Sequence, residues 1–512
     1  MKKEYLMGID MGTSSVKVGL FDLQGHEVAS HSEPYPLYTP RSGWAEQDIN
    51  DWWNAICIST RKIFEENPID PASIVSLSAD TTGCTVIFAD EDMNVVRPAL
   101  LWMDARASKE AKELTATGDA ALVQNGGTPV SAESMPAKAL WVKKNEPETY
   151  KKAAHVFECI DWLMYRLTGE LNGSLANAAP RWYYNPVKNQ WPTSFYESGG
   201  LGDLLDKFPD HIIPIGTKIG RLQAQAASDL GLPEGIVVGE GGLDAFVGMV
   251  GLGVTDTEKL ALITGTSHLV LGLTEKETHA EGIWGSYLNA VVPGLQMVEG
   301  GQIATGGAVS WFKNHFAGEA EKEAQRTGKS IYQVLNERAE QLSPGADGLL
   351  VLDYFQGNRN PYADADVRGM IYGLSLNHTA YHMYRAIIEG ICYGTELILE
   401  KFRAGGAKPG RIRIAGGAVH SRFWVQAHAD ISNTPIEIPE ITEAPCLGSA
   451  ILGAIAAEVY PDIATAVDNM VHIRKVITPD ENRHSEYMKY YKNYVRCYKE
   501  SKGWMHSVTE NI

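Results

Sequence analysis

The stretch LMGIDMGTSSVKVGLFD, residues 6–22, decides the fold. It reads as two short apolar strands around the turn Gly12-Thr13-Ser14. Such a turn presents backbone N–H groups and small hydroxyls, which suits close approach by an anionic phosphate. Asp10, at the end of the first strand, is placed to hold a divalent cation directly or through water. Walker A and dinucleotide-binding patterns are absent, so those nucleotide sites are disfavoured, and an ordinary hairpin turn stays open as the alternative.

A second copy of this design lies in the other half of the chain. The stretch LALITGTSHLVLGL, residues 260–273, is again strand, Gly-Thr-Ser turn and strand, with the turn at Gly265, Thr266 and Ser267. Two such turns at the heads of two half-chains indicate a duplicated α/β unit, and internal similarity takes precedence over other interpretations. We expect two facing phosphate turns with a cleft between them, and therefore a nucleoside triphosphate site.

Length and composition fit a globular protein of two domains. The chain has 512 residues, which suits two domains of roughly 250 residues. The net charge of −18 argues against a nucleic-acid or anionic-membrane surface, because both need basic patches. Six scattered cysteines without a metal-ligand spacing predict reduced thiols. No stretch reads as a signal peptide or membrane span, so we expect a cytoplasmic protein. The sequence leaves open whether the protein forms a homodimer.

Polar residues follow predicted buried strands at three points. Residues 80–85, DTTGCT, follow the strand at 74–79, and Asp104 and Arg106 follow another strand end. Asp244 opens a helix after a glycine-rich strand end. Open α/β sheets bind ligands beyond their strand ends, so these side chains are candidates for a site. A structural salt bridge between Asp104 and Arg106 is an equal alternative, and Asp244 has the alternative of a helix N-cap.

Helical spacing is clear in two longer segments. Residues 51–65 carry apolar positions at helical spacing, with Asn50 as the expected N-cap. Residues 381–403 form a long amphipathic pattern that stops at two glycines. The sequence therefore predicts helices over both segments.

Taken together, the motifs resemble the FGGY family of carbohydrate kinases, within the actin, hexokinase and Hsp70 fold superfamily. The resemblance spans roughly residues 5–460. Its pieces occur in order at residues 8–14, 102–106, 242–245, 264–267 and 415–418, with a sixth at 357–362 leading to 368–369. It implies an α/β fold of two actin/hexokinase-like (ribonuclease H-like) domains with an interdomain cleft. The implied N-terminal domain covers 1–253, with the sugar and part of the ATP phosphate site, and the C-terminal domain covers 254–512, with ATP.

The resemblance also implies ATP-dependent phosphorylation of a sugar or polyol hydroxyl, with ATP and Mg²⁺ as cofactors. Asp244 would be the general base, since an aspartate can orient the attacking hydroxyl and accept its proton. Asp10 would lie near Mg²⁺. The implied ATP-binding residues are Gly12, Thr13, Ser14, Lys17, Gly265, Thr266, Ser267, Gly306, Gly416, Gly417 and Ser421.

The sugar side resembles the ribulokinase branch. Glycerol kinases carry Arg-Glu, and xylulokinases Met-His, where this chain has Thr81 and Thr82. Residues 130–133 and 136–141 resemble the same branch. Where some ribulokinases place a lysine, this chain has Arg181 in a divergent context. The implied substrate-binding residues are Asp80, Thr82, Trp102, Asp104, Glu133 and Arg181.

We therefore expect a pentulose kinase acting on the terminal hydroxyl, with ribulose ahead of xylulose. A xylulokinase or a polyol kinase for erythritol or a pentitol is the alternative. A nucleotide-dependent chaperone or sensor of the same superfamily would share both phosphate turns, but it would not need Asp244 or the polar cluster at 80–104. A carbohydrate-binding protein without catalysis would lack the base or a phosphate turn, and neither is missing.

Overall fold

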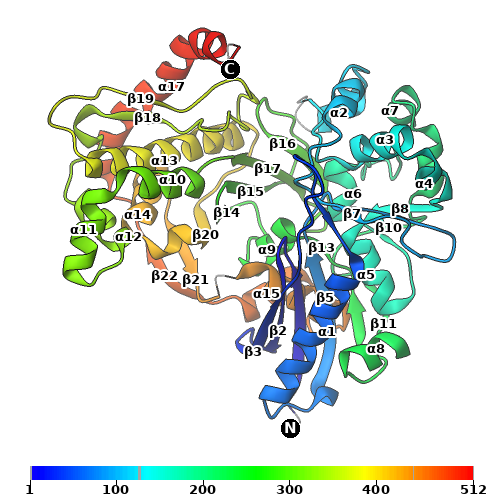
Figure 1. The fold of residues 1–512 in the computed structure, drawn as a ribbon. Coiled ribbons are helices and arrows are strands. Elements are labelled where there is room, and N and C mark those ends of the chain that lie inside the picture. The colour runs from blue at the N-terminus through cyan, green and yellow to red at the C-terminus, as the bar shows by residue number, and fades with distance from the viewer. Residues whose placement is uncertain (1–2, 125–128, 442, 511–512) are drawn as a thin grey trace. The chain divides into compact units, whose positions relative to one another are not determined.

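The computed structural model describes residues 3–124, 129–441 and 443–510 (Figure 1). The chain forms two compact units. The first comprises the described residues within Met1–Thr255, Gly285–Met297 and Glu443–His472, and the second those within Asp256–Trp284, Val298–Thr442 and Ile473–Ile512. The sequence predicts one boundary after residue 253. Along the sequence, however, the two units alternate, because the later segments Gly285–Met297 and Glu443–His472 belong to the first unit.

The first unit is a sheet with surrounding helices. Its strands are β1 (Tyr5–Met11), β2 (Ser15–Asp22), β3 (Glu27–Pro34), β4 (Glu46–Gln47), β5 (Ile74–Thr81), β6 (Val86–Ala89), β7 (Ala99–Leu100), β8 (His155–Glu158), β9 (Gly173–Ser174), β10 (Ile212–Ile213), β11 (Lys218–Arg221), β12 (Val237–Gly239) and β13 (Gly242–Leu243). Its α-helices are α1 (Ile49–Glu66), α2 (Ser108–Thr115), α3 (Met135–Asn145), α4 (Pro147–Lys152), α5 (Cys159–Thr168), α6 (Leu175–Arg181), α7 (Thr193–Ser198), α8 (Ala224–Leu230), α9 (Asp244–Gly251), α15 (Ala444–Ala456) and α16 (Ile463–Met470). Short 3-10 turns are η1 (Pro71–Ser73), η2 (Ala120–Gln124) and η3 (Gly202–Lys207).

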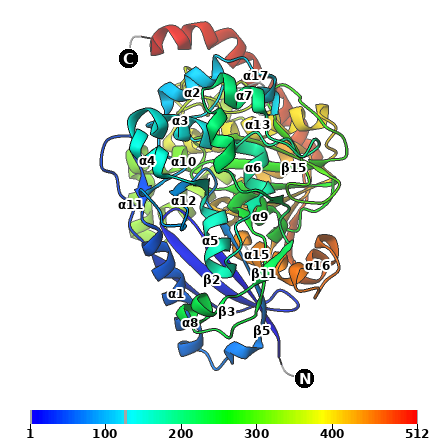
Figure 2. The same ribbon diagram turned by 90° about the vertical axis from the view of Figure 1, so that its right-hand side faces the viewer.

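The main sheet of the first unit has the strand order β3-β2-β1-β5-β12-β11. Strands β1, β2 and β3 are antiparallel neighbours, whereas β1, β5 and β12 run parallel. The short strand β13 also pairs with β5 in parallel. Helix α1 packs along β2 and β3, as Figure 2 shows, while α15 packs against β1 and β5. The carboxyl ends of β1, β5 and β13 therefore meet at one edge of the sheet.

Glycines allow α15 to approach the sheet of this unit closely. A Cβ at Gly8 in β1 would lie 1.9 Å from the carbonyl oxygen of Cys446 in α15, and one at Gly251 in α9 would lie 1.9 Å from that of Ala444. Neither position tolerates a side chain without moving backbone. Helix α15 therefore belongs to the first unit, although two segments of the second unit, Asp256–Trp284 and Val298–Thr442, precede it in the chain.

The second unit repeats the architecture. Its strands are β14 (Lys259–Thr264), β15 (His268–Thr274), β17 (Gln296–Gln302, which starts inside the segment grouped with the first unit), β18 (Leu350–Leu352), β19 (Met370–Tyr372), β20 (Arg411–Gly416), β21 (Ile436–Pro439) and β22 (Ile473–Ile477); β16 (Trp284–Leu288) lies almost wholly in that segment. Its helices are α10 (Gly306–Phe316), α11 (Gly318–Thr327), α12 (Ile331–Glu340), α13 (Ala380–Ala404), α14 (Arg422–Ser432) and α17 (Glu481–Thr509), with 3-10 turns η4 (Ala346–Gly348) and η5 (Gly417–His420).

The strand order is β16-β17-β15-β14-β20-β21-β22, and its six strands from β17 to β22 match the first sheet position by position. Strands β14 and β15 are an antiparallel hairpin, β14, β20 and β21 run parallel, and β22 returns antiparallel. Each unit has its own apolar core. The duplicated α/β unit predicted from the two Gly-Thr-Ser turns is therefore present in the structure.

Local predictions from the sequence agree with the structure in most places. The helix expected over 381–403 is α13, and that over 51–65 is α1. The expected cap Asn50 is wrong, because Asp48 caps α1 by accepting a hydrogen bond from the Asn50 N–H. All six cysteines lie in the described part of the chain and are unpaired there. Across the described residues, none of the helices combines the length and apolar character needed to span a membrane.

Candidate active site

Three carboxylates gather at the edge of the first sheet. The register of β1 and β5 places Asp10 opposite Asp80, and that of β13 and β5 places Gly242 opposite Asp80, two residues before Asp244. Their charges interact: Asp10 and Asp244 both act on Asp80, and Asp10 acts on Asp244. Three of the sequence-predicted site residues are therefore brought together by strand pairing.

Burial raises the pKa of each of these carboxyls, and the charge of a neighbouring aspartate adds to the rise for Asp80 and for Asp244. Removal from water, together with the charge of Asp10, raises the pKa of Asp244 to about 7. The pKa of Asp10 rises to about 6, mainly through burial, and that of Asp80 rises well above its usual range for the same reason. Asp10 and Asp244 are partly accessible to solvent, whereas Asp80 is 0% exposed. Each of these carboxyls therefore takes up a proton more readily than an exposed aspartate does.

Asp80 faces the protein interior. Its Oδ2 accepts a hydrogen bond of 2.7 Å from Ser449 Oγ in α15. With no exposed surface, Asp80 is not open to a sugar in this structure, and it lies beside Asp10 in the strand register. Ser449 is not among the residues predicted for the site, although it lies in a glycine-rich helix start.

The first phosphate turn is tied to its surroundings through carbonyl oxygens and a hydroxyl. The Gln47 side chain donates a hydrogen bond of 2.8 Å to the Thr13 carbonyl, and the Tyr35 N–H donates one of 3.1 Å to the Ser14 carbonyl. Trp102 Nε1 donates one of 3.0 Å to Thr13 Oγ1. Within the described residues, the Thr13 and Ser14 N–H groups donate no hydrogen bond to the protein. The turn is thus fixed while its amides stay available to an anion.

Lys17 lies in an ion-pair cluster. Its Nζ contacts Glu443, and it lies 3.1 Å from Glu27 Oε2. These two carboxylates neutralise the lysine in the structure. A phosphate contact from Lys17, as the resemblance implies, would therefore compete with both pairs.

The second phosphate turn is fixed in a similar way within the second unit. Gly265, Thr266 and Ser267 are exposed. The Gly306 N–H donates a hydrogen bond of 3.2 Å to the Gly265 carbonyl, and the Thr305 N–H donates one of 2.9 Å to that of Thr266. A Cβ at Gly306 would lie 2.2 Å from the Gly265 oxygen. Close contact between turn and helix start therefore requires the glycine at 306.

The other predicted nucleotide residues follow β20. Gly416 has φ of 86°, and a Cβ there would lie 1.8 Å from the Thr264 carbonyl oxygen. A Cβ at Gly417 would meet open space. Ser421 caps α14 and donates a hydrogen bond of 2.9 Å to Asn336 Oδ1, a residue that sequence reasoning did not single out. The backbone conformation and close packing at position 416 therefore require glycine, whereas the space beside Gly417 is open.

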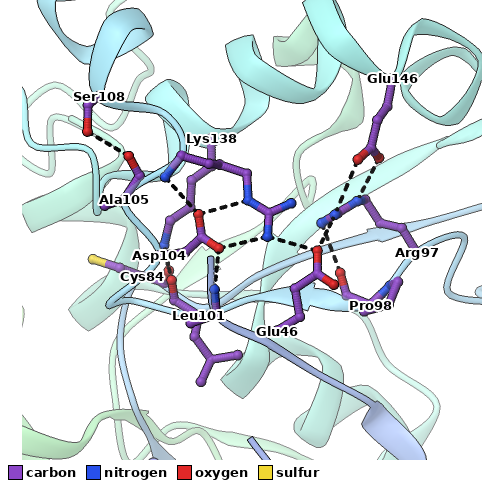
Figure 3. Close-up of polar contacts among 12 residues, drawn as sticks. Glu46, Cys84, Arg97, Pro98, Leu101, Asp104, Ala105, Ser108, Lys138 and Glu146 are labelled. Atoms are coloured by element: carbon purple, nitrogen blue, oxygen red, sulfur yellow. Dashed lines mark hydrogen bonds and ion pairs between the residues drawn. The ribbon is translucent and has the colours of Figure 1, made fainter. Parts of the chain in front are cut away.

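Asp104 is a structural ion-pair residue (Figure 3). It is 0% exposed, and its carboxylate lies 2.7 Å from the Arg106 guanidinium and accepts a 2.6 Å hydrogen bond from the Ala45 N–H. Arg106 also pairs with Glu46, which pairs with Arg97. The salt-bridge interpretation of Asp104 is therefore the one that the structure supports.

The remaining sugar-side residues lie around the turn after β5. Thr82 is buried and shares a hydrogen bond of 2.9 Å with Thr85. Glu133 and Arg181 are partly exposed, and the charges of both act on the Cys84 thiol, so both lie near this turn. Of the predicted sugar residues, Trp102, Glu133 and Arg181 are partly exposed, and Thr82 lies in the turn itself.

Comparison with known proteins agrees with this geometry. Residues 5–251 match the N-terminal domain, and residues 260–457 the C-terminal domain, of the FGGY family of carbohydrate kinases. An FGGY carbohydrate kinase domain-containing protein from Xenopus laevis is 33% identical, with 96% of each chain covered. A ribulokinase from Geobacillus thermodenitrificans is 29% identical over 97% of this chain and 94% of that protein. A solved xylulose kinase from Rhodospirillum rubrum, 25% identical, superposes with a TM-score of 0.87 over 98% of this chain and 100% of the other.

These matches confirm the expected fold class of two actin/hexokinase-like domains. Since both family domains match in order and a relative above 30% identity spans nearly the whole length, the chain belongs to the FGGY family of carbohydrate kinases, which are ATP-dependent phosphotransferases with an alcohol group as acceptor.

Proposed function

We propose that this kinase transfers the γ-phosphoryl group of ATP to the terminal hydroxyl of a pentulose, with ribulose preferred over xylulose. The observation that carries the proposal is Asp244, a partly exposed carboxylate at the end of β13 whose pKa is raised to about 7. A base with a pKa near the working pH combines a deprotonated population with a strong tendency to accept a proton.

Asp244 acts as the general base. Its carboxylate orients the sugar hydroxyl and accepts the hydroxyl proton as the new oxygen–phosphorus bond forms. The bond between the γ-phosphorus and the bridging oxygen breaks, and ADP leaves with that electron pair. Positioning and charge stabilisation supply the rest of the acceleration in reactions of this kind.

Asp10 is proposed to hold Mg²⁺. Its carboxylate is partly exposed, and a bound cation would favour the charged form that burial and the charge of Glu443 disfavour. The described residues contain no group of three or more His, Cys, Asp or Glu side chains arranged for a metal. This fits Mg²⁺, which proteins commonly hold through one or two carboxylates plus substrate phosphates. When bound, Mg²⁺ would offset negative charge on the phosphate oxygens.

The two phosphate turns are proposed to bind ATP. In the first unit the free amides of Thr13 and Ser14 suit phosphate oxygens. In the second unit the exposed Gly265–Ser267 turn serves the same group, and Gly417 leaves space for the nucleoside. We thus assign the sugar and part of the phosphate site to the predicted domain 1–253, and ATP binding to 254–512.

Ribulose is preferred on the evidence of the turn after β5. The segment DTTGCT, residues 80–85, resembles ribulokinases, and a ribulokinase is among the relatives. Thr82, Trp102, Glu133 and Arg181 are the residues we assign to the sugar, through hydroxyl, indole and charged groups.

A substrate panel tests the proposal. ADP formation is measured with D- and L-ribulose, D- and L-xylulose, erythritol, ribitol and glycerol, each as kcat/KM. We expect a ribulose to give the highest value. An advantage of about tenfold or more for glycerol would contradict the proposal. ADP formation that no sugar stimulates would favour the chaperone or sensor alternative.

A further inference from the structure

Two buried charged side chains hold the backbone of Cys84, in the turn after β5. Glu158 Oε2 accepts a hydrogen bond of 2.8 Å from the Cys84 N–H, and Lys138 Nζ donates one of 2.6 Å to the Cys84 carbonyl. Both charged side chains are 0% exposed. Cys84 has φ of 59°, in the left-handed region that residues other than glycine adopt at a cost. The two opposite charges therefore stabilise a backbone conformation that the residue itself disfavours.

This turn lies directly against the residue before the proposed base. A Cβ at Gly83 would lie 1.9 Å from Leu243 Cδ1, so the glycine backbone contacts that side chain. Leu243 also pairs with Thr81 in the β13–β5 register. A shift of the Cys84 turn would therefore displace Leu243, and with it Asp244, the next residue in the chain.

Lys138 also holds a second strand end. Its Nζ donates a hydrogen bond of 2.6 Å to the Leu101 carbonyl, after β7, as Figure 3 shows. The next residue, Trp102, donates the hydrogen bond to Thr13 in the first phosphate turn. One ammonium group thus links the turn beside Asp244 with the turn beside the phosphate site.

A position needed only for packing would hold an apolar side chain. Burying an ammonium group is costly, and desolvation accordingly lowers the pKa of Lys138. The Glu158 carboxylate is also fully buried, and it accepts two further hydrogen bonds, of 2.6 Å from Asn177 Nδ2 and 2.7 Å from Trp182 Nε1. Polar groups kept inside a core against such a cost are characteristic of functional sites.

We propose that Lys138 and Glu158 are positioning residues of the phosphoryl transfer, which fix the 82–85 turn and through Leu243 the placement of Asp244. The inference rests on the proposed function, because it assigns Asp244 as the base. Neither side chain touches substrate; both act through the backbone that they hold.

The test compares Lys138→Met and Glu158→Gln with Lys143→Met. Lys143 lies on the same helix, α3, but it is partly exposed and pairs with Asp203 at 2.6 Å. For each folded variant, kcat and the KM values for ATP and for the best ketose of the wild-type panel are measured, with kcat/KM against pH. Wild-type activity with ketoses tests the proposed function separately.

We expect Lys138→Met to lower the ketose kcat/KM by at least about 30-fold, since small displacements of a reacting group have effects of this order. The KM for ATP should stay within about twofold, and the acid limb of the pH profile should move, because Asp244 changes its surroundings. Lys143→Met should match the wild type. If Lys138→Met does not fold, Glu158→Gln tests the proposal by the same criteria, with a smaller expected loss of ketose kcat/KM. Folded variants that lose thermal stability yet keep kcat, the ketose KM and the pH profile of the wild type would overturn the proposal.

Discussion

Ser449 Oγ donates a hydrogen bond of 2.7 Å to Asp80 Oδ2, joining α15 to the end of β5 within the first unit. The bond turns the Asp80 carboxylate inward, beside Asp10 and away from solvent. The resemblance implies a sugar contact for Asp80, but this geometry gives it a different role. Asp80 supports the carboxylate that we assign to the metal.

Asp80→Asn should therefore lower kcat without changing sugar selectivity. The amide cannot ionise beside Asp10, and the substitution leaves the sugar-facing side chains in place. We expect the ratio of kcat/KM for ribulose and xylulose to stay within about twofold of the wild type, while the Mg²⁺ concentration needed for half-maximal rate changes. Ser449→Ala should shift the Mg²⁺ dependence in the same way. A tenfold change in the ratio, on the order of one lost sugar hydrogen bond, would restore Asp80 to the sugar site.

Gly416 and Gly417 form a matched pair for the nucleotide site. Gly416→Ala places a Cβ against the Thr264 carbonyl at a positive φ, so it should lower the free energy of unfolding by about 1–3 kcal/mol or more. The added Cβ of Gly417→Ala has no protein atom within 4 Å, so this substitution should leave stability unchanged. If the nucleotide binds beside Gly417, the same substitution should raise the KM for ATP about tenfold. Urea denaturation and ATP kinetics measure both. An unchanged KM for ATP in a stable Gly417→Ala protein would remove Gly417 from the site.

The rate should depend on pH through Asp244. Only the deprotonated carboxylate accepts the hydroxyl proton, and burial raises the pKa of Asp244 to about 7. The ketose kcat/KM should therefore rise with pH and level off above about 7, falling about tenfold per pH unit below it. Profiles in two overlapping buffer series, with ATP and Mg²⁺ saturating, measure this limb. A profile that stays flat down to about pH 5 would show that no group with a raised pKa controls the step.

The sequence predicts well what local pattern determines. Both phosphate turns, the strand ends at Asp10 and Asp244, and the long helix α13 follow from glycine placement and apolar periodicity. These turns, strand ends and helix depend on short segments, so a single sequence contains enough information. The register that places Asp10 opposite Asp80 joins β1 with β5, which are far apart in the chain, and it comes from the structure alone.

Contacts between distant segments escape such reasoning. Ser449 and Asp80 are 369 positions apart, and Lys17 and Glu443 are 426 positions apart. No periodicity or spacing links either pair, since α15 returns to the first sheet only after most of the second unit. The ion pair of Asp104 with Arg106 is local, but a two-residue spacing fits a ligand site as well as a salt bridge; the surrounding burial decides between them.

The most direct test of the central claim is ketose-stimulated ADP formation by the wild type and by Asp244→Asn, with Asp203→Asn as an exposed-carboxylate control. Loss of a general base typically costs about 10²–10⁴-fold in rate. We expect the wild type and Asp203→Asn to turn over a ketose at equal rates. Asp244→Asn should lose turnover by that factor while its thermal stability and its affinity for ATP stay near those of the wild type. A folded Asp244→Asn protein that retains more than about a third of the wild-type rate would contradict the assignment of Asp244 as the base.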